Sequence, residues 1–307
     1  MTALADRIAY VALVSSDPVF AASVCERHFG LPRADLSSPA GAVPVFALGR
    51  SALALFPPGH PLVEGAERPC VHHIALAVDD LDAAAARANA AGTPAIGLDG
   101  RRTHRLAREA TNGVRVVLTE PLGLTPRTGG PVERLDHVGV ASSDVREDEA
   151  LFSGTFGFPV ESRQTDMEVS MAVESFTSDK YGVVYHTRPP QPVGGLRVTF
   201  ITTGDCELEF LANFDPRQEG RVDHGRAGTT QQDQGAVARY VASRGRGLHH
   251  FALKVRDIDA LLSGMAAAGL PMIDTKGRPG SRRALIGFPH PRALGGVLMH
   301  AVQREEV

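Results

Sequence analysis

The chain of 307 residues repeats itself, and this repetition limits what it can fold into. Residues 10–32 read YVALVSSDPVFAASVCERHFGLP and residues 137–159 read HVGVASSDVREDEALFSGTFGFP, so the two segments align without a gap at an offset of 127. A second pair, HHIALAVDDLDAAAARANAAGTP from His72 and HHFALKVRDIDALLSGMAAAGLP from His249, aligns at an offset of 177. Such self-similarity indicates a fold built from repeated units.

Each half also contains two similar quarters. Every quarter starts with a short apolar strand (IAYVALV, HHIALAV, LDHVGVA and HHFALKV) and continues with several strand-like runs. Between them lies a helix-like stretch preceded by an aspartate, which suits a helix N-cap. The cap candidates are Asp17, Asp80, Asp144 and Asp257, with Asp82 and Asp259 equally possible in quarters two and four. The pattern predicts an α+β fold in which a β-α-β-β-β unit is used four times and pairs of units form one curved mixed sheet around a site.

The segment PLGLTPRTGGPVE, residues 121–133, is rich in proline and glycine, which is typical of a connection. We therefore predict a first module over residues 1–122, a linker over 123–133 and a second module over 134–307. The second half has 50 residues more than the first between its anchor segments, and they lie around 165–195 and 215–234. The latter stretch is polar and is predicted to be a surface loop.

Charge and composition exclude several partners. The net charge of −3 and the lack of a run of like charges argue against nucleic acid or a membrane surface. The first residues lack the pattern of a secretion signal, and no stretch approaches 18 apolar residues, so we expect a cytoplasmic protein. Cys25, Cys70 and Cys206 are far apart, which argues against a disulfide framework or a thiolate zinc site.

Four strands of the second half each offer one metal-binding side chain: His137, Glu209, His250 and His300. In CELEFLANF the glutamates alternate with Leu208 and Phe210, so one face of this strand carries carboxylates and the other faces a core. Nitrogen and oxygen donors on neighbouring strands suit a divalent transition metal rather than calcium.

The first half provides an internal control for this set. There the positions equivalent to His137, Glu209 and His300 hold Tyr10, Ala54 and, approximately, Val117, and only His73, opposite His250, is kept. Core packing alone does not predict that one half keeps a polar set while the other loses it. The difference favours a metal site confined to the second half.

From Leu135 onward the chain resembles methylmalonyl-CoA epimerases of the vicinal oxygen chelate superfamily, which also contains glyoxalase I and extradiol dioxygenases. The resemblance rests on LDHVGVASSD, TGDCELEFLANF, the RGRGLHHFALKV stretch and FPHPRALGGVL, and it covers about half of the chain. It implies two modules of this superfamily's fold, the first of them without a metal site.

The resemblance also implies that His137, Glu209, His250 and the residue at position 300 bind one metal ion. The family has a carboxylate at the last position, whereas this chain has His300. The set is therefore richer in nitrogen, which favours Co²⁺, Ni²⁺ or Zn²⁺ while leaving Mn²⁺ and Fe²⁺ open. Alternatively, His300 acts as a proton shuttle, because the ordinary pKa of histidine lies near neutrality.

The epimerases use a carboxylate base beside the metal, and the resemblance points to the stretch RQTDMEVSMAVESF. Asp166, Glu168 and Glu174 are the candidates, and we favour Glu174 because it lies in the alternating run SMAVESF. The candidates for holding the substrate are aromatic and basic side chains: Tyr185, His186, Arg282 and Arg283, together with Tyr181 and Arg278.

We expect an enzyme that acts on a small molecule. Four protein ligands leave about two positions on an octahedral ion, which favours an isomerase, epimerase or lyase that transfers a proton next to a carbonyl, acyl-CoA included. If His300 does not bind, His137, His250 and Glu209 form a 2-His-1-carboxylate set, which favours an Fe²⁺ dioxygenase acting on a ring or a 2-oxoacid. The third alternative is a binding or resistance protein that leaves its ligand unchanged. A monomer and a homodimer are both open.

Overall fold

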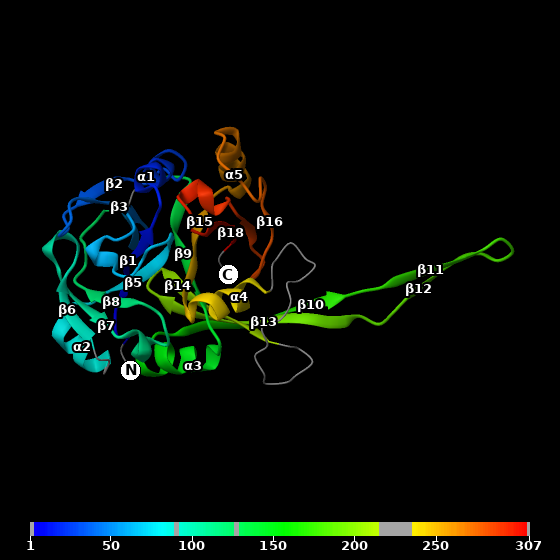
Figure 1. Ribbon diagram of the computed structural model, residues 1–307, viewed down its shortest axis with the longest axis horizontal. Helices are drawn as coiled ribbons and strands as arrows, with labels where there is room; N and C mark the ends of the chain where they lie inside the picture. The colour runs from blue at the N-terminus through cyan, green and yellow to red at the C-terminus, as the bar shows by residue number, and fades with distance from the viewer. Residues whose placement is uncertain (1–2, 89–91, 126–128, 215–234, 306–307) are drawn as a thin grey trace.

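The computed structural model describes residues 3–88, 92–125, 129–214 and 235–305. Within these residues the chain forms two large mixed sheets of eight strands each, which lie side by side (Figure 1). The first follows the order β2-β3-β4-β1-β5-β8-β7-β6 and the second the order β10-β13-β14-β9-β15-β18-β17-β16.

The strands of the first sheet are β1 (Arg7–Val14), β2 (Arg33–Leu36), β3 (Val43–Leu48), β4 (Ser51–Phe56), β5 (Cys70–Ala77), β6 (Gly92–Ile96), β7 (Arg102–Leu106) and β8 (Val116–Thr119). Its helices are α1 (Pro18–Arg27) and α2 (Leu81–Ala88). Short 3₁₀ turns are η1 (Pro61–Val63), η2 (Leu98–Gly100) and η3 (Arg108–Thr111).

The strands of the second sheet are β9 (Val132–Ala141), β10 (Val160–Ser170), β13 (Gln191–Thr203), β14 (Cys206–Phe214), β15 (Gly247–Val255), β16 (Arg278–Pro279), β17 (Leu285–Gly287) and β18 (Met299–Gln303). Its helices are α3 (Val145–Glu149), continued by the π-helical turn η4 (Ala150–Thr155), then α4 (Ala236–Arg244) and α5 (Ile258–Ala267). A 3₁₀ turn, η5 (Pro291–Leu294), precedes the last strand.

The two sheets have the same internal pairing. In the first, β1 runs antiparallel to β5, and each of these strands has the last strand of its own unit, β4 or β8, beside it in parallel. In the second, β9 and β15 take the same places, beside β14 and β18. The predicted four β-α-β-β-β units, paired into two modules, are confirmed. The predicted linker, residues 123–133, follows β8 and includes the first two residues of β9, and residues 126–128 lie outside the described part of the chain.

The predicted helix starts are also confirmed. Asp17, Asp144 and Asp257 each accept a hydrogen bond from a backbone N–H in the first turn that follows, and Asp80 accepts one from Ala83. These caps satisfy donors that a helix otherwise leaves free at its N-terminus. The start of the helix is thus encoded at the same point of each unit.

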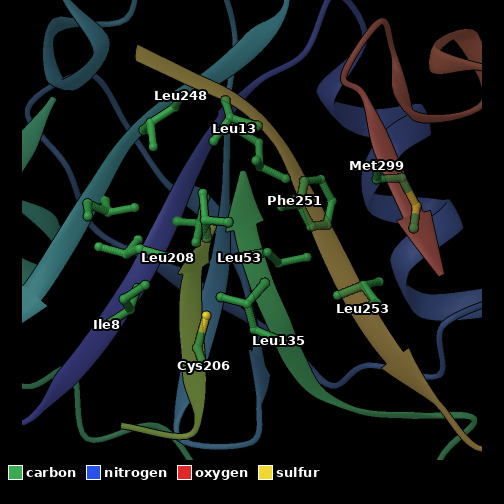
Figure 2. Packing of buried hydrophobic residues seen from close by; sticks show 14 of the residues in the cluster. Ile8, Leu13, Leu53, Leu135, Cys206, Leu208, Leu248, Phe251, Leu253 and Met299 are labelled. Carbon is green, nitrogen blue, oxygen red and sulfur yellow. The ribbon is translucent and has the colours of Figure 1, made fainter. Parts of the chain in front are cut away.

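One continuous apolar core joins the two modules. Ile8 and Leu13 of β1 and Leu53 of β4 belong to the same buried cluster as side chains of the second sheet. Figure 2 shows them among second-sheet partners, which include Leu135, Cys206, Leu208, Leu248, Phe251 and Leu253. Each sheet therefore turns one face toward this shared core, and its other face is left to form a site or a second, local cluster.

The inserted residues of the second half mostly extend the sheet. Strands β10 and β13 pair up to Ser170 and Gln191, and beyond them β11 (Val173–Ser178) and β12 (Gly182–Thr187) form a hairpin that projects far from the body (Figure 1). The predicted surface loop at 215–234 lies outside the described residues. Among the helices that are described, none has the length and apolarity needed to cross a bilayer.

Candidate metal centre

The four predicted ligand positions meet on the face of the second sheet that is turned away from the shared core. Strand β9 places Val138 and Val140 in the core, so His137 and Gly139 lie on its other face. Both Glu209 of β14 and His250 of β15 are register partners of Gly139. His300 of β18 is level with Ala252, which is itself opposite His137.

The three imidazoles form a compact group. Their ring centroids are 5.5 Å apart for His137 and His250, and 5.0 Å apart for each of these with His300. One ligand atom from each ring lies within 4.8 Å of the others. Glu209 Oε2 lies 3.4 Å from His137 Nε2 and 3.3 Å from His250 Nε2. All four side chains are buried, so the structure brings the four predicted residues together in one place.

The donors fit a divalent cation. Among the described residues, His137 Nε2 and His300 Nδ1 are buried without a hydrogen-bond partner, which a protein interior rarely tolerates. Burial lowers the pKa of His300 well below its usual value and opposes a charge on His137, but the Glu209 and Asp136 carboxylates raise the pKa of His137 overall. Between these carboxylates and His137, a proton would supply the positive charge that a metal ion supplies when the four side chains bind it.

Asp136 fixes the orientation of His137. Its carboxylate has no exposed surface and receives a hydrogen bond from His137 Nδ1 at 2.8 Å and one from Arg304 at 2.7 Å. Burial opposes its ionisation, but these partners hold the pKa of Asp136 well below its ordinary value. A carboxylate on the outer nitrogen of a ligating histidine sets the tautomer and directs the other nitrogen at the metal.

Gly139 makes room for His250. A Cβ at this position would lie 2.0 Å from Cε1 and 2.3 Å from Nδ1 of the imidazole, so the ring rests directly on the glycine backbone. Asp136 and Gly139 are functional residues that the sequence reasoning missed. The motif LDHVGV places both next to His137, and this adjacency is the signal by which they could have been found.

The ligands form one wall of a cavity of about 300 Å³. Most of the lining is apolar and includes Leu196, Val198, Leu211, Ile273, Ile286, Phe288, Leu298 and Val302. Phe288 stacks on His300 with ring centroids 4.7 Å apart and planes 33° apart, which holds this imidazole in place. Besides the candidate ligands, the polar lining residues include Gln164, Asp166, Arg278 and Arg282.

Asp166 and Gln164 of β10 bring an acid to this cavity. The Gln164 amide donates to Asp166 Oδ1 at 2.5 Å. Burial and the negative charge of Glu209 raise the pKa of Asp166, although the hydrogen bond from Gln164 opposes the shift. Of the two candidate bases whose side chains are described, Asp166 lines the cavity and Glu174 does not. For Glu168, only the backbone pairing in β10 is described.

Other predicted site residues lie elsewhere. Glu174 is on the projecting hairpin and pairs with Arg188, and Tyr185 and His186 are on the opposite strand of the same hairpin. None of the three lines the cavity, so the structure places them away from the candidate metal site. The physical reason is that β11 and β12 continue away from the body instead of curling over the sheet (Figure 1).

The predicted arginines divide in the same way. Arg282 lines the metal cavity, lies 3.7 Å above the Phe200 ring and pairs with Glu207 at 2.6 Å. Arg283 instead lines a separate surface hollow next to Glu133. Arg278 lines the metal cavity and pairs with Asp274.

The first module has filled the corresponding place. Tyr10, Ala54 and Val117 belong to a local apolar cluster there, and His73 forms a 3.2 Å hydrogen bond with the Tyr10 hydroxyl. His73 is opposite Ala12, and Ala54 pairs with the same residue, just as His250 and Glu209 share Gly139. The register therefore confirms which positions correspond and which of them have changed.

Comparison with known proteins agrees with this geometry. The sequence profile of the glyoxalase, bleomycin resistance protein and dioxygenase superfamily matches residues 136–288, which contain three of the four ligand positions. The chain belongs to this superfamily. Mitochondrial methylmalonyl-CoA epimerase of Homo sapiens is 23% identical over 185 residues, which cover 60% of this chain and 82% of the epimerase.

The chain is also similar to solved structures. A substituted 4-hydroxymandelate synthase from Streptomyces coelicolor has a TM-score of 0.62 at 18% identity and covers 99% of this chain and 94% of its own. Methylmalonyl-CoA epimerase from Mycobacterium tuberculosis has a TM-score of 0.38 at 20% identity and covers 60% of this chain and 95% of its own. The first of these likenesses shows that the fold of the superfamily extends over the whole chain.

Proposed function

We propose that the second module is a divalent-metal-dependent enzyme site that transfers a proton next to a carbonyl group of a small substrate. The observation that carries the proposal is the convergence of His137, Glu209, His250 and His300 on one cavity that also holds a separate carboxylate, Asp166. Isomerases and lyases need both parts, a group that stabilises an enolate and a base that moves the proton.

A bound divalent ion would act as a Lewis acid on two neighbouring substrate oxygens and stabilise the negative charge that develops there. The ligand set has three imidazoles and one carboxylate, which favours Co²⁺, Ni²⁺ or Zn²⁺ over ions that prefer oxygen, with Mn²⁺ and Fe²⁺ still compatible. Asp136 keeps His137 oriented, and Phe288 does the same for His300.

The rest of the cavity sets the substrate class. Its wall is largely apolar, and its volume of about 300 Å³ is at the lower end of small-molecule sites, so it suits the reacting part of a small acid or acyl group. Asp166 takes the proton from the carbon next to the carbonyl and returns it, and its raised pKa makes it a stronger base than an ordinary aspartate. The similarity to methylmalonyl-CoA epimerase makes 2-substituted acyl-CoA thioesters the first substrates to test.

The test is exchange of the α-hydrogen in deuterium oxide. The metal-loaded protein is incubated with 2-substituted acyl-CoA thioesters and 2-oxoacids, and deuterium incorporation is followed by mass spectrometry. We expect exchange that falls by about 10²–10⁴-fold in Asp166→Asn while metal content stays unchanged. Glu174→Gln on the hairpin is the matched control and should keep the activity. A broad panel without exchange, or equal rates in Asp166→Asn, would refute the proposal.

A second candidate is an Fe²⁺ dioxygenase. It is favoured by the whole-chain likeness in fold to 4-hydroxymandelate synthase and by the 2-His-1-carboxylate subset His137, His250 and Glu209. The protein is reconstituted with Fe²⁺ without oxygen, and oxygen uptake is then measured with catechols and hydroxyphenyl-oxoacids. Uptake without α-hydrogen exchange would select this function over proton transfer.

A further inference from the structure

A second cavity, of about 320 Å³, lies between the two modules and is surrounded by arginines. The first module contributes residues 65–68, the start of β5, Arg108 of η3, and Gly113 and Arg115 just before β8, and the second contributes the end of α4 and the start of β15. The charged side chains on this wall are one carboxylate and five guanidinium groups: Glu67, Arg68, Arg108, Arg115, Arg244 and Arg246. We call this cavity the arginine cleft.

Most of this positive charge is not neutralised by the protein. Arg246 is neutralised, because it pairs with both Glu147 and Asp148 at 2.6 Å. Arg108 instead donates to two backbone carbonyl oxygens, those of Gly113 and Arg246, each at 3.2 Å. Across the described ranges, no carboxylate lies within ion-pair distance of the remaining guanidinium groups, which belong to Arg68, Arg115 and Arg244.

The charges are close enough to affect one another. Arg115 is half-buried, and burial together with the positive charge of Arg108 lowers the pKa of its guanidinium. His72, on the same wall, is buried, and burial followed by Arg115 lowers its pKa to about 4. Arg108 is also half-buried, and like charges held together partly away from water destabilise a fold unless an opposite charge joins them.

Geometry points to an anion with more than one negative charge. Arg68, Arg108, Arg115 and Arg244 against Glu67 leave a formal excess of three positive charges, which is more than a single carboxylate balances. The backbone bonds of Arg108 hold its guanidinium in place at the seam between modules, so this donor is preorganised. Planar guanidinium groups match phosphate oxygens through paired hydrogen bonds.

We propose that the arginine cleft binds a small phosphate-bearing anion. The site is separate from the metal cavity, since the described residues that line the two are all different; Tyr240 of the arginine cleft and His249 of the metal cavity meet edge to face at 4.9 Å. The ligand spans the seam and contacts both modules. Its binding depends on Arg115 and Arg68 and does not require a metal ion.

The test is isothermal titration of the full-length protein after removal of metal with a chelator, using inorganic phosphate, pyrophosphate and a sugar phosphate. Arg115→Gln and Arg68→Gln are the variants. Arg27→Gln is the control, because Arg27 is exposed on α1 and its substitution removes the same charge away from the cleft. We expect binding to the wild-type and control proteins and at least tenfold weaker binding to the other two. The phosphate source with the lowest dissociation constant identifies whether the ligand is free phosphate or an organic phosphate.

Thermal unfolding adds a readout that a merely structural role would not produce. In phosphate-free buffer, Arg115→Gln should unfold at the same or a higher temperature than wild type, because it removes repulsion from Arg108. Phosphate should then raise the unfolding temperature of wild type and not that of Arg115→Gln. Equal affinities of wild type and Arg115→Gln, or no heat with any phosphate, would overturn the proposal. Tighter binding of succinate than of pyrophosphate would overturn the phosphate class.

Discussion

Replacing Gly139 by alanine tests the metal centre through geometry alone, without removing a donor. The added Cβ would lie 2.0 Å from His250 Cε1, whereas carbon atoms in good contact are about 3.5 Å apart, so the ring has to move by about 1.5 Å. Metal–ligand distances tolerate about 0.2 Å, and His250 would therefore be lost as a ligand. Since loss of groups that only orient a ligand lowers metal affinity by about 10–100-fold, we expect a decrease of at least about 100-fold for Gly139→Ala.

Competition with a chromophoric chelator measures this affinity, and circular dichroism shows whether the variant folds. Ala12→Gly is the matched control, because Ala12 occupies the same place in the first sheet, beside His73 and Ala54. This change should leave metal affinity as it is. If Gly139→Ala binds metal as tightly as wild type, His250 is not a ligand and the reasoning fails.

Three further predictions concern the fourth ligand, the hairpin and pH. His300→Ala should lower metal affinity by at least about tenfold in the same competition assay, and an unchanged metal content would exclude the four-ligand set. Residues 171–190 can be replaced by an Asn-Gly turn that joins Ser170 to Gln191. This change should leave the unfolding temperature unchanged, because these two residues are already paired and none of the replaced residues is buried in a core. A clear decrease would show that the hairpin stabilises the fold. Burial lowers the pKa of His72 to about 4, so the unfolded chain binds this proton more tightly than the folded one. Stability present at pH 7 is therefore lost as the pH falls from about 6.5 toward 4, and the loss is about 2 kcal/mol at pH 5. Urea unfolding of His72→Gln should show a loss between pH 7 and 5 that is smaller by this amount, and an equal loss in both proteins would contradict the assignment.

The fold and the meeting of the four candidate ligands on one sheet face could be predicted, because strand alternation, helix caps and the internal repeats are all visible in the sequence. Strand alternation and the repeat offsets place His137, Glu209 and His250 on equivalent faces, and an aspartate cap begins a helix in each unit. The position of Glu174 relative to the cavity could not be predicted in this way. Its alternating neighbourhood correctly indicated a strand, but whether that strand turns over the site or away from it depends on tertiary contacts that alternation does not encode. Asp166, eight residues earlier, has a similar local pattern and does reach the cavity.

The two modules share one fold but fill the same place of the sheet with different side chains. Where the second module has His137, Gly139 and Glu209, the first has Tyr10, Ala12 and Ala54, which fill the equivalent space with an apolar cluster. The other face of the first sheet packs against the second module in the shared core. A polar set of three imidazoles and a buried carboxylate destabilises the module that contains it unless a metal is bound, because each donor is removed from water. The first module keeps only His73 of this polar set, and its contact with β9 and β15 supplies stability to the half that holds the candidate metal site.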